Sequence, residues 1–301
     1  MKPSCPVCLS SNTRWRYEIT RFKPSFHVHL CQSCHCLFQY PQPSNPFGYY
    51  HEGYYAGHAP YAYQDERKQY EYHKHVHEAR LQTLLKYLPP SLHGGKFLDV
   101  GCGFGGFALS ASRYFKAYGL DVSAYAINEG KKWLQSYSTD KSVRLFRGSL
   151  TQLPKNKELR GGFAVISLVE VAEHLPTPRQ DFQAAYQLLL PGGILLVQTA
   201  NFSAWQAILA GEKYHYFLPG HLVYYTSEGL KNMLKQIGFR HFVEFFPVDF
   251  SLMAKWRKAR GNWKNFLDWR HALRIGYYHI ISRFEFGGRR LTSSYVLYAI
   301  R

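Results

Sequence analysis

Short apolar runs alternate with longer amphipathic stretches through most of the chain after residue 95. The runs predict strands at 96–100, 117–121, 143–147, 163–169, 193–199, 240–246 and 293–300. The amphipathic stretches predict helices at about 106–114, 124–137, 179–190 and 227–237. This alternation predicts an α/β fold with a mostly parallel sheet, covered on both faces, that binds ligands where its strands end.

A further helix is expected ahead of the first strand, at residues 66–88. A Pro-Pro pair at 89–90 would end it, because proline cannot continue the hydrogen bonding of a helix. Its apolar side chains fall on one stripe: Val76, Leu81, Leu84, Leu85 and Leu88. With 301 residues and 46% hydrophobic content, the chain is long enough for one full α/β domain and an appendage.

A glycine-rich turn follows the first predicted strand. The run is Lys96-Phe-Leu-Asp-Val-Gly-Cys-Gly-Phe-Gly-Gly-Phe107, and Tyr118-Gly-Leu-Asp121 ends the next strand. Glycines let the chain turn tightly and approach a ligand, and the helix that follows can present free amides to it. An acid about twenty residues further on, here Asp121, suits the hydroxyls of a ribose. The turn therefore predicts a pocket for a nucleoside-bearing cofactor.

Gly101, Gly103 and Gly106 also fit the G-x-G-x-x-G pattern of dinucleotide sites. Asp99 argues against that interpretation, because it lies two residues before the first glycine, where a pyrophosphate would meet a negative charge. A cationic cofactor without phosphates suits this carboxylate better.

The turn resembles motif I of the class I S-adenosylmethionine-dependent methyltransferases. The resemblance extends to 163–175, which ends in Glu-His-Leu, and to 188–197, which contains a Pro-Gly-Gly turn. It implies a Rossmann-like class I methyltransferase fold with a seven-stranded, mostly parallel sheet, whose last strand, 294–300, would be antiparallel. It also implies S-adenosyl-L-methionine as the cofactor.

The same resemblance implies a set of cofactor-binding residues: Asp99, Gly101, Gly103, Gly105, Asp121, Ser149 and Leu150. The glycines would cradle the methionine end of the cofactor, with Asp99 near its ammonium group. Asp121 would hold the ribose hydroxyls, and the two residues after Gly148 would contact the adenine.

Four cysteines near the N-terminus form two Cys-x-x-Cys pairs, Cys5 with Cys8 and Cys31 with Cys34, separated by 22 residues. This spacing suits a tetrahedral, structural Zn²⁺ with no open position for chemistry. Disulfide bonds are the alternative, although a chain without a secretion signal is expected in a reducing compartment. His35 or Cys36 could also replace Cys34 as a ligand.

These cysteine pairs, a Pro-x-Pro linker and a tyrosine-rich segment at 49–55 together resemble a subgroup of small-molecule methyltransferases that have an N-terminal zinc knuckle and often act on sugars. The chain then divides into a zinc-binding module at 1–45, an aromatic lid or linker with a helix at 46–92, and a methyltransferase domain at 93–301. Segment 49–55 would either pack over the domain or close on the cofactor or substrate.

Two histidines are the candidate catalytic residues. His174 follows the fourth strand, at the mouth of the site in this family, and imidazole titrates near neutral pH; its alternative role is packing. His221 lies ahead of a helix that Thr226 or Ser227 would cap. Sugar C-methyltransferases with a zinc knuckle carry Glu-His near this place, whereas Gly220 precedes the histidine here. Methylation of oxygen or nitrogen is therefore favoured over carbon.

The formal charge of +17 and the pI near 9.6 predict an anionic partner. Much of the excess charge lies in 255–290, inside an insertion at about 247–290 between the sixth and seventh strands. Trp256, Trp263 and Phe266 are among the aromatic residues that interleave with these charges. This composition suits an anionic membrane surface or a phosphate backbone such as RNA, and a solvated helical cap is the alternative.

No apolar stretch reaches the roughly twenty residues of a spanning helix, and the N-terminus lacks the apolar core of a signal peptide. We therefore expect a cytoplasmic protein and leave peripheral membrane contact open. The expected function is methyl transfer from S-adenosyl-L-methionine to oxygen or nitrogen of a small, anionic or lipid-linked intermediate, such as a sugar. An RNA methyltransferase and a non-catalytic scaffold are the alternatives. Acceptor identity, general base and oligomeric state do not follow from the sequence.

Overall fold

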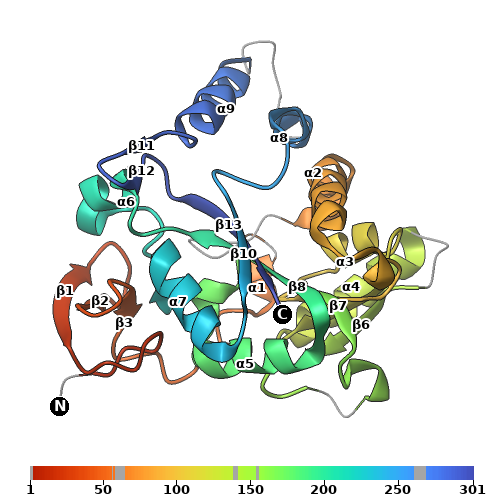
Figure 1. The fold of residues 1–301 in the computed structure, drawn as a ribbon, viewed down its shortest axis with the longest axis horizontal. Helices are drawn as coiled ribbons and strands as arrows, with labels where there is room; N and C mark the ends of the chain where they lie inside the picture. Colours follow the sequence, from red (N-terminus) through yellow and green to blue (C-terminus); the bar gives the residue numbers. More distant parts are fainter. Residues whose placement is uncertain (1–2, 56, 58–64, 138–141, 154–155, 261–268) are drawn as a thin grey trace.

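The fold centres on a large sheet of parallel strands with an antiparallel edge. The computed structural model describes residues 3–55, 57, 65–137, 142–153, 156–260 and 269–301. Within these residues seven strands form the sheet, in the order β10-β13-β8-β7-β4-β5-β6 (Figure 1). Their bounds are β4 Lys96–Val100, β5 Lys116–Asp121, β6 Arg144–Arg147, β7 Phe163–Val169, β8 Leu189–Ala200, β10 His241–Phe245 and β13 Ser294–Ile300.

Strand direction agrees with the expected fold class. β4 runs parallel to β5 and β7, β5 to β6, and β7 to β8. β13 is antiparallel to both β8 and β10. The predicted seven-stranded, mostly parallel sheet with an antiparallel last strand is therefore confirmed.

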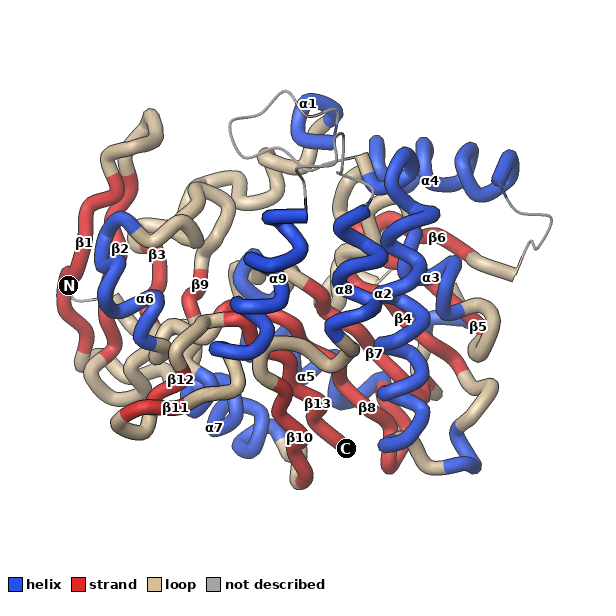
Figure 2. Tube along the Cα trace, turned by 90° about the horizontal axis from the view of Figure 1, so that it is seen from above, coloured by secondary structure: helices blue, strands red, loops and turns tan. Residues whose placement is uncertain are grey.

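Helices cover both faces of this sheet (Figure 2). The helices are α2 Glu66–Tyr87 and α3 Gly106–Ala111 on one face, and α5 Pro178–Leu188 and α7 Ser227–Ile237 on the other. Phe97 of β4 packs with α2 and α3, while the next residue, Leu98, packs with α5 and α7. Because side chains alternate along a strand, a strand covered on both faces is apolar at every position, which produces the continuous runs in the sequence.

Most observed bounds lie within one or two residues of the predicted ones, and the largest differences are at the start of β8 and the end of α3. β8 begins at Leu189, inside the helix predicted at 179–190, because Leu189 already pairs with Phe163 of β7. α3 ends at Ala111 instead of 114, and Phe115, which is 4% exposed, turns into the core ahead of β5. α4, Ala124–Tyr137, has the predicted bounds and packs beside β5 and β6.

The N-terminal cysteine segment folds against the larger domain. Its strands are β1 Thr13–Ile19, β2 Phe26–Cys31 and β3 Leu37–Gln39. β3 pairs with the short strand β9, Val223–Tyr224, so that one antiparallel sheet contains strands from both parts of the chain. Phe26 and Val28 share a hydrophobic core with Phe202 and Tyr224. The segment therefore shares part of its core with residues of the larger domain.

The described residues of the basic insertion form two helices and a hairpin, namely α8 Leu252–Ala259, α9 Trp269–Ile281, β11 Glu285–Phe286 and β12 Arg289–Arg290. α8 packs against α2, and Arg80 Nε of α2 lies 2.9 Å from Asp249 Oδ1, with both side chains almost fully buried. A buried ion pair requires both partners, because a single buried charge is costly. Trp263 and Phe266 lie outside the described residues.

Across the described part of the chain, no helix combines the length and the apolar character that crossing a bilayer requires.

Candidate active site and cysteine cluster

The glycine-rich turn leaves β4 beside the end of β5. The amides of Gly101 and Cys102 both donate to Leu120 O, at 2.7 and 3.2 Å, which holds the turn against β5. Gly101 has a φ of +67°, and a Cβ there would lie 2.4 Å from Val171 Cγ2. An L side chain cannot occupy that space without a shift of the neighbouring chain. Gly101 and Gly103 line a cavity of about 420 Å³ at the carboxyl ends of the strands.

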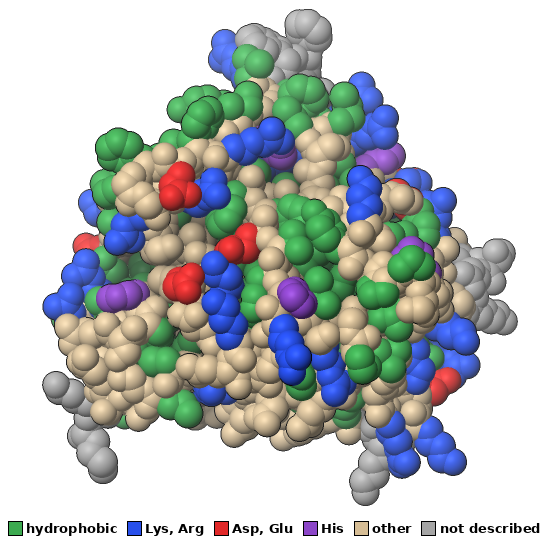
Figure 3. Space-filling view, viewed as in Figure 1, with side chains coloured by type: hydrophobic (Ala, Val, Ile, Leu, Met, Phe, Trp, Pro, Cys, Tyr) green, Lys and Arg blue, Asp and Glu red, His purple; other side chains and the backbone are tan. Residues whose placement is uncertain are grey.

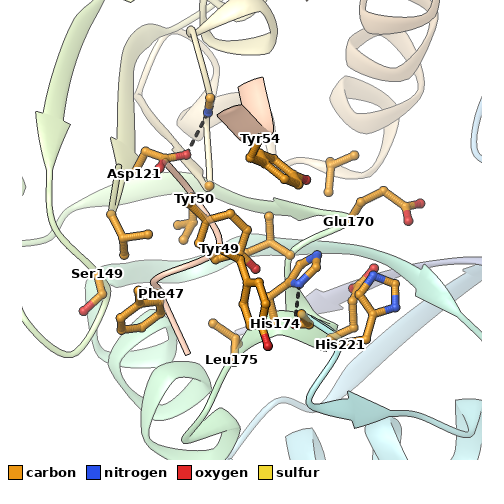
Figure 4. Close-up of a pocket in the computed structure, with 18 of the residues that line it drawn as sticks. Phe47, Tyr49, Tyr50, Tyr54, Asp121, Ser149, Glu170, His174, Leu175 and His221 are labelled. Carbon is orange, nitrogen blue, oxygen red and sulfur yellow. Dashed lines mark hydrogen bonds between the residues drawn. The ribbon is translucent and has the colours of Figure 1, made fainter. Parts of the chain in front are cut away.

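Asp121 holds this turn from the end of β5. Its carboxylate accepts hydrogen bonds from Gly103 N at 2.9 Å, Ser123 N at 2.8 Å and the Tyr55 hydroxyl at 3.5 Å. Burial raises the pKa of Asp121 to about 6, although these hydrogen bonds favour the ionised form. Asp121 and Ser149 lie on the same side of the cavity (Figure 4), and Leu150 also lines it.

Asp99 and Gly105 lie near the turn but not on the cavity wall. The Asp99 carboxylate accepts a 2.7 Å hydrogen bond from Ser167 Oγ of β7, and the side chain is 5% exposed. Burial raises the pKa of Asp99 to about 7, with the charges of Glu66 and Asp121 adding to the rise. Gly105 forms the N-cap of α3. The expected contacts of these two residues with the cofactor remain predictions.

Glu66, at the start of α2, supports the same turn and was missed in the sequence. Its Oε1 accepts hydrogen bonds from Phe104 N at 3.1 Å and Gly106 N at 3.5 Å, and the residue is 8% exposed. The carboxylate thus satisfies amides at the open start of α3, where a negative charge also matches the helix dipole. No local sequence pattern links Glu66 to a turn about forty residues further on.

The tyrosine-rich segment covers one side of the cavity (Figure 4). Five aromatic residues line the cavity from this part of the chain, either within the short helix α1, Glu52–Tyr55, or just before it. They are Phe47, Tyr49, Tyr50, Tyr54 and Tyr55. The Tyr55 ring packs edge-on against Phe104 of the glycine-rich turn at 5.3 Å between centroids. The Tyr50 ring packs in the same way against His174 at 5.7 Å. This segment therefore contacts both ends of the cavity.

His174 and His221 come together at the end of the cavity away from Asp121 (Figure 4). Their ring centroids are 4.6 Å apart. His174 Nδ1 lies 2.8 Å from Gly220 O, and His221 Nδ1 lies 2.7 Å from Tyr216 O. A carbonyl oxygen can only accept, so each Nδ1 donates its hydrogen and each Nε2 keeps a lone pair. Burial lowers the pKa of His174 to about 4 and the pKa of His221 well below its ordinary value.

Two glutamates that the sequence prediction passed over lie beside these imidazoles. Glu173 is 2% exposed, and its Oε2 accepts a 2.9 Å hydrogen bond from Thr199 Oγ1. Burial, followed by the charge of Glu170, raises the pKa of Glu173 well above its ordinary value. Glu170 accepts hydrogen bonds from the side chains of Tyr216 and Gln198. The spacing Glu-x-x-Glu-His at the end of a predicted strand was the signal that could have identified both.

The four paired cysteines form one cluster. Cys5 Sγ lies 3.6 Å from Cys34 Sγ, and Cys8 Sγ lies 3.4 Å from Cys31 Sγ. All four sulfurs lie within 4.8 Å of one another, close to the roughly 3.8 Å that tetrahedral Zn–S bonds of about 2.3 Å would give. Cys36 lies outside the cluster and packs against Thr226. None of the described cysteines forms a disulfide, and the set is compatible with a structural metal.

A comparison with protein families shows which family this chain belongs to. Residues 72–242, more than half of the chain, match a family model described as a methyltransferase domain. The chain belongs to this methyltransferase family. The expected membership of the class I S-adenosylmethionine-dependent methyltransferases is thereby confirmed.

Two curated relatives each match about two fifths of this methyltransferase. It is 32% identical over 126 residues to a ubiquinone biosynthesis O-methyltransferase of Cronobacter sakazakii, covering 41% of this chain and 50% of that protein. It is 33% identical over 122 residues to the protein of the same name in Colwellia psychrerythraea, covering 39% and 48%. The chain spans about half the length of these relatives.

Solved structures with a similar fold have low sequence identity to this methyltransferase. Phosphoethanolamine N-methyltransferase 2 of Haemonchus contortus is 16% identical, with a TM-score of 0.49 over 73% of this chain and 51% of that one. Geranyl diphosphate C-methyltransferase of Streptomyces coelicolor is 14% identical, with a TM-score of 0.48 over 74% and 78%.

Proposed function

We propose that this methyltransferase transfers a methyl group from S-adenosyl-L-methionine to a hydroxyl oxygen of a small organic acceptor. The proposal rests on one observation: the glycine-rich turn and Asp121 line one end of a single cavity, while His174 and His221 line the other. The curated relatives are named O-methyltransferases, which supports oxygen as the methylated atom.

The cofactor end is assigned from the turn outward. The Asp121 carboxylate, already oriented by two backbone amides, has lone pairs left for the hydroxyls of a ribose. Ser149 and Leu150 would contact the adenine, and Gly101 and Gly103 would allow the methionine end to approach the backbone. The bound sulfonium would supply an activated methyl group.

At the acceptor end, His174 and His221 are assigned to hold the acceptor hydroxyl and to assist the loss of its proton to water in the cavity. The hydroxyl oxygen forms the bond to the methyl carbon as the carbon–sulfur bond breaks, and the sulfur keeps that electron pair as a thioether. The tyrosines of segment 49–55 would cover the reacting groups and reduce access of bulk water.

Gly220 also favours an oxygen acceptor. A Cβ at this position would meet only ordinary contacts, 3.7 Å from His174 Nδ1 and from the Tyr50 hydroxyl. A Cβ would fit here without a clash, yet the carboxylate expected of a sugar C-methyltransferase is missing. Methylation at carbon, which must remove a far less acidic proton, therefore has less support.

The cofactor assignment is tested by calorimetric titration with S-adenosylhomocysteine. We expect the wild-type chain to bind it and Asp121→Ala to lose at least tenfold in affinity, because the ribose contact and the support of Gly103 are both removed. Glu170→Gln, at the opposite end of the cavity, should keep wild-type affinity. Equal affinities for wild type and Asp121→Ala would overturn the assignment.

The acceptor class is tested with labelled S-adenosyl-L-methionine and a panel of small phenols, sugars and amines. Product analysis by mass spectrometry and NMR should find the label on oxygen. Label found on nitrogen or carbon would show that the acceptor class is wrong while leaving the cofactor assignment intact.

We also propose that the cysteine cluster holds a structural Zn²⁺, because its four sulfurs lie close to tetrahedral spacing.

We propose further that the basic insertion contacts an anionic membrane. On α9, Leu273, Tyr277 and Ile280 are 59%, 68% and 55% exposed and share one helical stripe, beside the exposed Arg270 and Arg274. In Figure 3, hydrophobic side chains are interspersed with Lys and Arg over the upper part of the face of the molecule that is drawn. Exposed apolar and cationic groups together are typical of interfacial binding.

Vesicle flotation tests this surface. We expect the wild-type chain to bind vesicles rich in phosphatidylglycerol and not vesicles of phosphatidylcholine. The double variant Leu273→Ser/Ile280→Ser should bind severalfold more weakly. The control Leu9→Ser removes an exposed leucine that is distant in sequence from α9, and it should bind vesicles as the wild type does. No flotation together with salt-dependent binding of RNA would favour the RNA alternative instead.

A further inference from the structure

We propose that Glu173, His174 and His221 form a divalent-cation site at the acceptor end of the cavity, and that the cation holds the acceptor oxygen. The inference rests on the proposed function, because the cation would act on the same hydroxyl. It adds a requirement that the methyl transfer alone does not impose: a metal bound by the chain itself.

The three side chains converge from separate parts of the fold. Glu173 and His174 belong to a short 3-10 helix, Ala172–His174, after β7, and His221 lies just before β9. One ligand atom from each residue lies within 4.8 Å of the other two. Metal–ligand bonds of about 2.1 Å require separations of at most roughly 4.2 Å, so the cluster would contract slightly on binding.

Backbone hydrogen bonds orient both imidazoles as metal ligands are usually oriented. Nδ1 of each ring donates to a main-chain carbonyl, Gly220 O for His174 and Tyr216 O for His221. Ligating histidines commonly donate their other ring N–H to a carbonyl or carboxylate, which fixes the tautomer and turns the lone pair toward the metal. Both carbonyls belong to one loop, so the loop orients both rings at once.

The carboxylate of Glu173 supplies the independent sign of a ligand. It is 2% exposed, Thr199 occupies Oε2, and Oε1 has no hydrogen-bond partner among the described residues. A buried acceptor without a partner costs about 1–3 kcal/mol and is rare in native proteins. A cation would satisfy this oxygen. Glu170 is a weaker candidate, because Tyr216 and Gln198 already hydrogen-bond its carboxylate.

Two imidazoles and one carboxylate leave positions open on a first-row divalent cation. All three residues line the cavity, so those positions would face the acceptor. A coordinated hydroxyl becomes more acidic, and its proton would leave to water while the oxygen stays oriented toward the methyl group. The acceptor class that fits is an oxygen chelator, such as a compound with neighbouring hydroxyl groups.

Mn²⁺ is a suitable probe, because it prefers oxygen and nitrogen ligands to the thiolates of the cysteine cluster and gives an EPR signal. We expect the wild-type chain to bind one Mn²⁺, and Glu173→Gln and His221→Asn to bind at least tenfold more weakly. Glu173→Gln keeps an acceptor for Thr199. Asp181→Asn, another buried acid on the cavity wall, should bind Mn²⁺ as the wild type does.

Titration of the same variants with S-adenosylhomocysteine separates the two proposals. Unchanged affinity in Glu173→Gln would show that the fold and the cofactor end are intact. Equal Mn²⁺ binding by wild type and Glu173→Gln, or no binding by wild type at millimolar Mn²⁺, would overturn the cation site. Failure of the wild type to bind S-adenosylhomocysteine would overturn the proposed function, whatever the Mn²⁺ result.

Discussion

Asp99 and Asp121 are both buried carboxylates at the ends of neighbouring strands, yet only Asp121 lines the cavity. Asp121 is held by the amides of Gly103 and Ser123, whereas Asp99 bonds Ser167 on the opposite neighbour of β4. The difference follows from direction, because one side chain turns toward the loop and the other toward β7. At the scale of single residues, burial also raises the pKa of both carboxyl groups.

The pKa of about 7 for Asp99 predicts a pH dependence of stability. Between its ordinary pKa and this raised value, the folded chain keeps the proton and the unfolded chain loses it, so stability falls as the pH rises. From pH 5.5 to 8.5 the free energy of unfolding should fall by on the order of 1–2 kcal/mol more in wild type than in Asp99→Asn. Urea denaturation at both pH values measures this, and parallel pH profiles would contradict it.

At the scale of elements, α2 and the insertion both support the site without lining it. Glu66 at the start of α2 accepts hydrogen bonds from the glycine-rich turn, and Arg80 further along α2 pairs with Asp249 of the insertion. No described residue of 247–290 lines the cavity, so the described helices of the insertion do not cap the site. α8 packs on α2 and α9 packs on α8, while α2 supports the glycine-rich turn through Glu66.

Replacing Glu66 tests this support. Glu66→Ala should lower the free energy of unfolding by about 1–3 kcal/mol, because buried amides of Phe104 and Gly106 lose their acceptor. Glu66→Gln should recover part of this loss. Glu71→Ala, whose side chain is largely exposed on the same helix, should change the value by less than about 0.5 kcal/mol. Equal effects at Glu66 and Glu71 in chemical denaturation would contradict the role of Glu66.

At the scale of the whole molecule, the cysteine segment and the acceptor end of the cavity are joined through one strand. β9 pairs with β3 and begins two residues after His221. The cysteine cluster also packs in the same core as Leu222 and Tyr225. Metal at the cluster would therefore stabilise the backbone that positions His221.

Hydrogen exchange after loss of the metal tests this connection. Cys8→Ser should lose tightly held zinc and show faster amide exchange in 13–39 and 223–224, with β4 unchanged, because the N-terminal strands share their core with β9. Cys36→Ala should keep its zinc, since this thiol lies outside the cluster. Zinc retained by Cys8→Ser but lost by Cys36→Ala would show that the ligand set is wrong.

Much of the fold could be predicted from local sequence. Runs such as 163–169 are apolar throughout because both faces of the strand are covered, and glycine at 101 is required by its backbone angle and by Val171. The cysteine pairs were recognisable by spacing alone. The start of β8 was missed, because the pairing of Leu189 with Phe163 depends on a strand distant in sequence.

The sequence by itself determined the alternation of strands and helices, the glycine-rich turn with Asp121, and the metal-ligand spacing of the cysteines. Each of these features depends on residues close together in the chain. Only the tertiary structure decided that Asp99 faces β7, that Glu66 supports the turn, and that Glu173 and His174 meet His221. These contacts join residues tens of positions apart. Their geometry depends on how the helices and strands pack, and no local pattern records it.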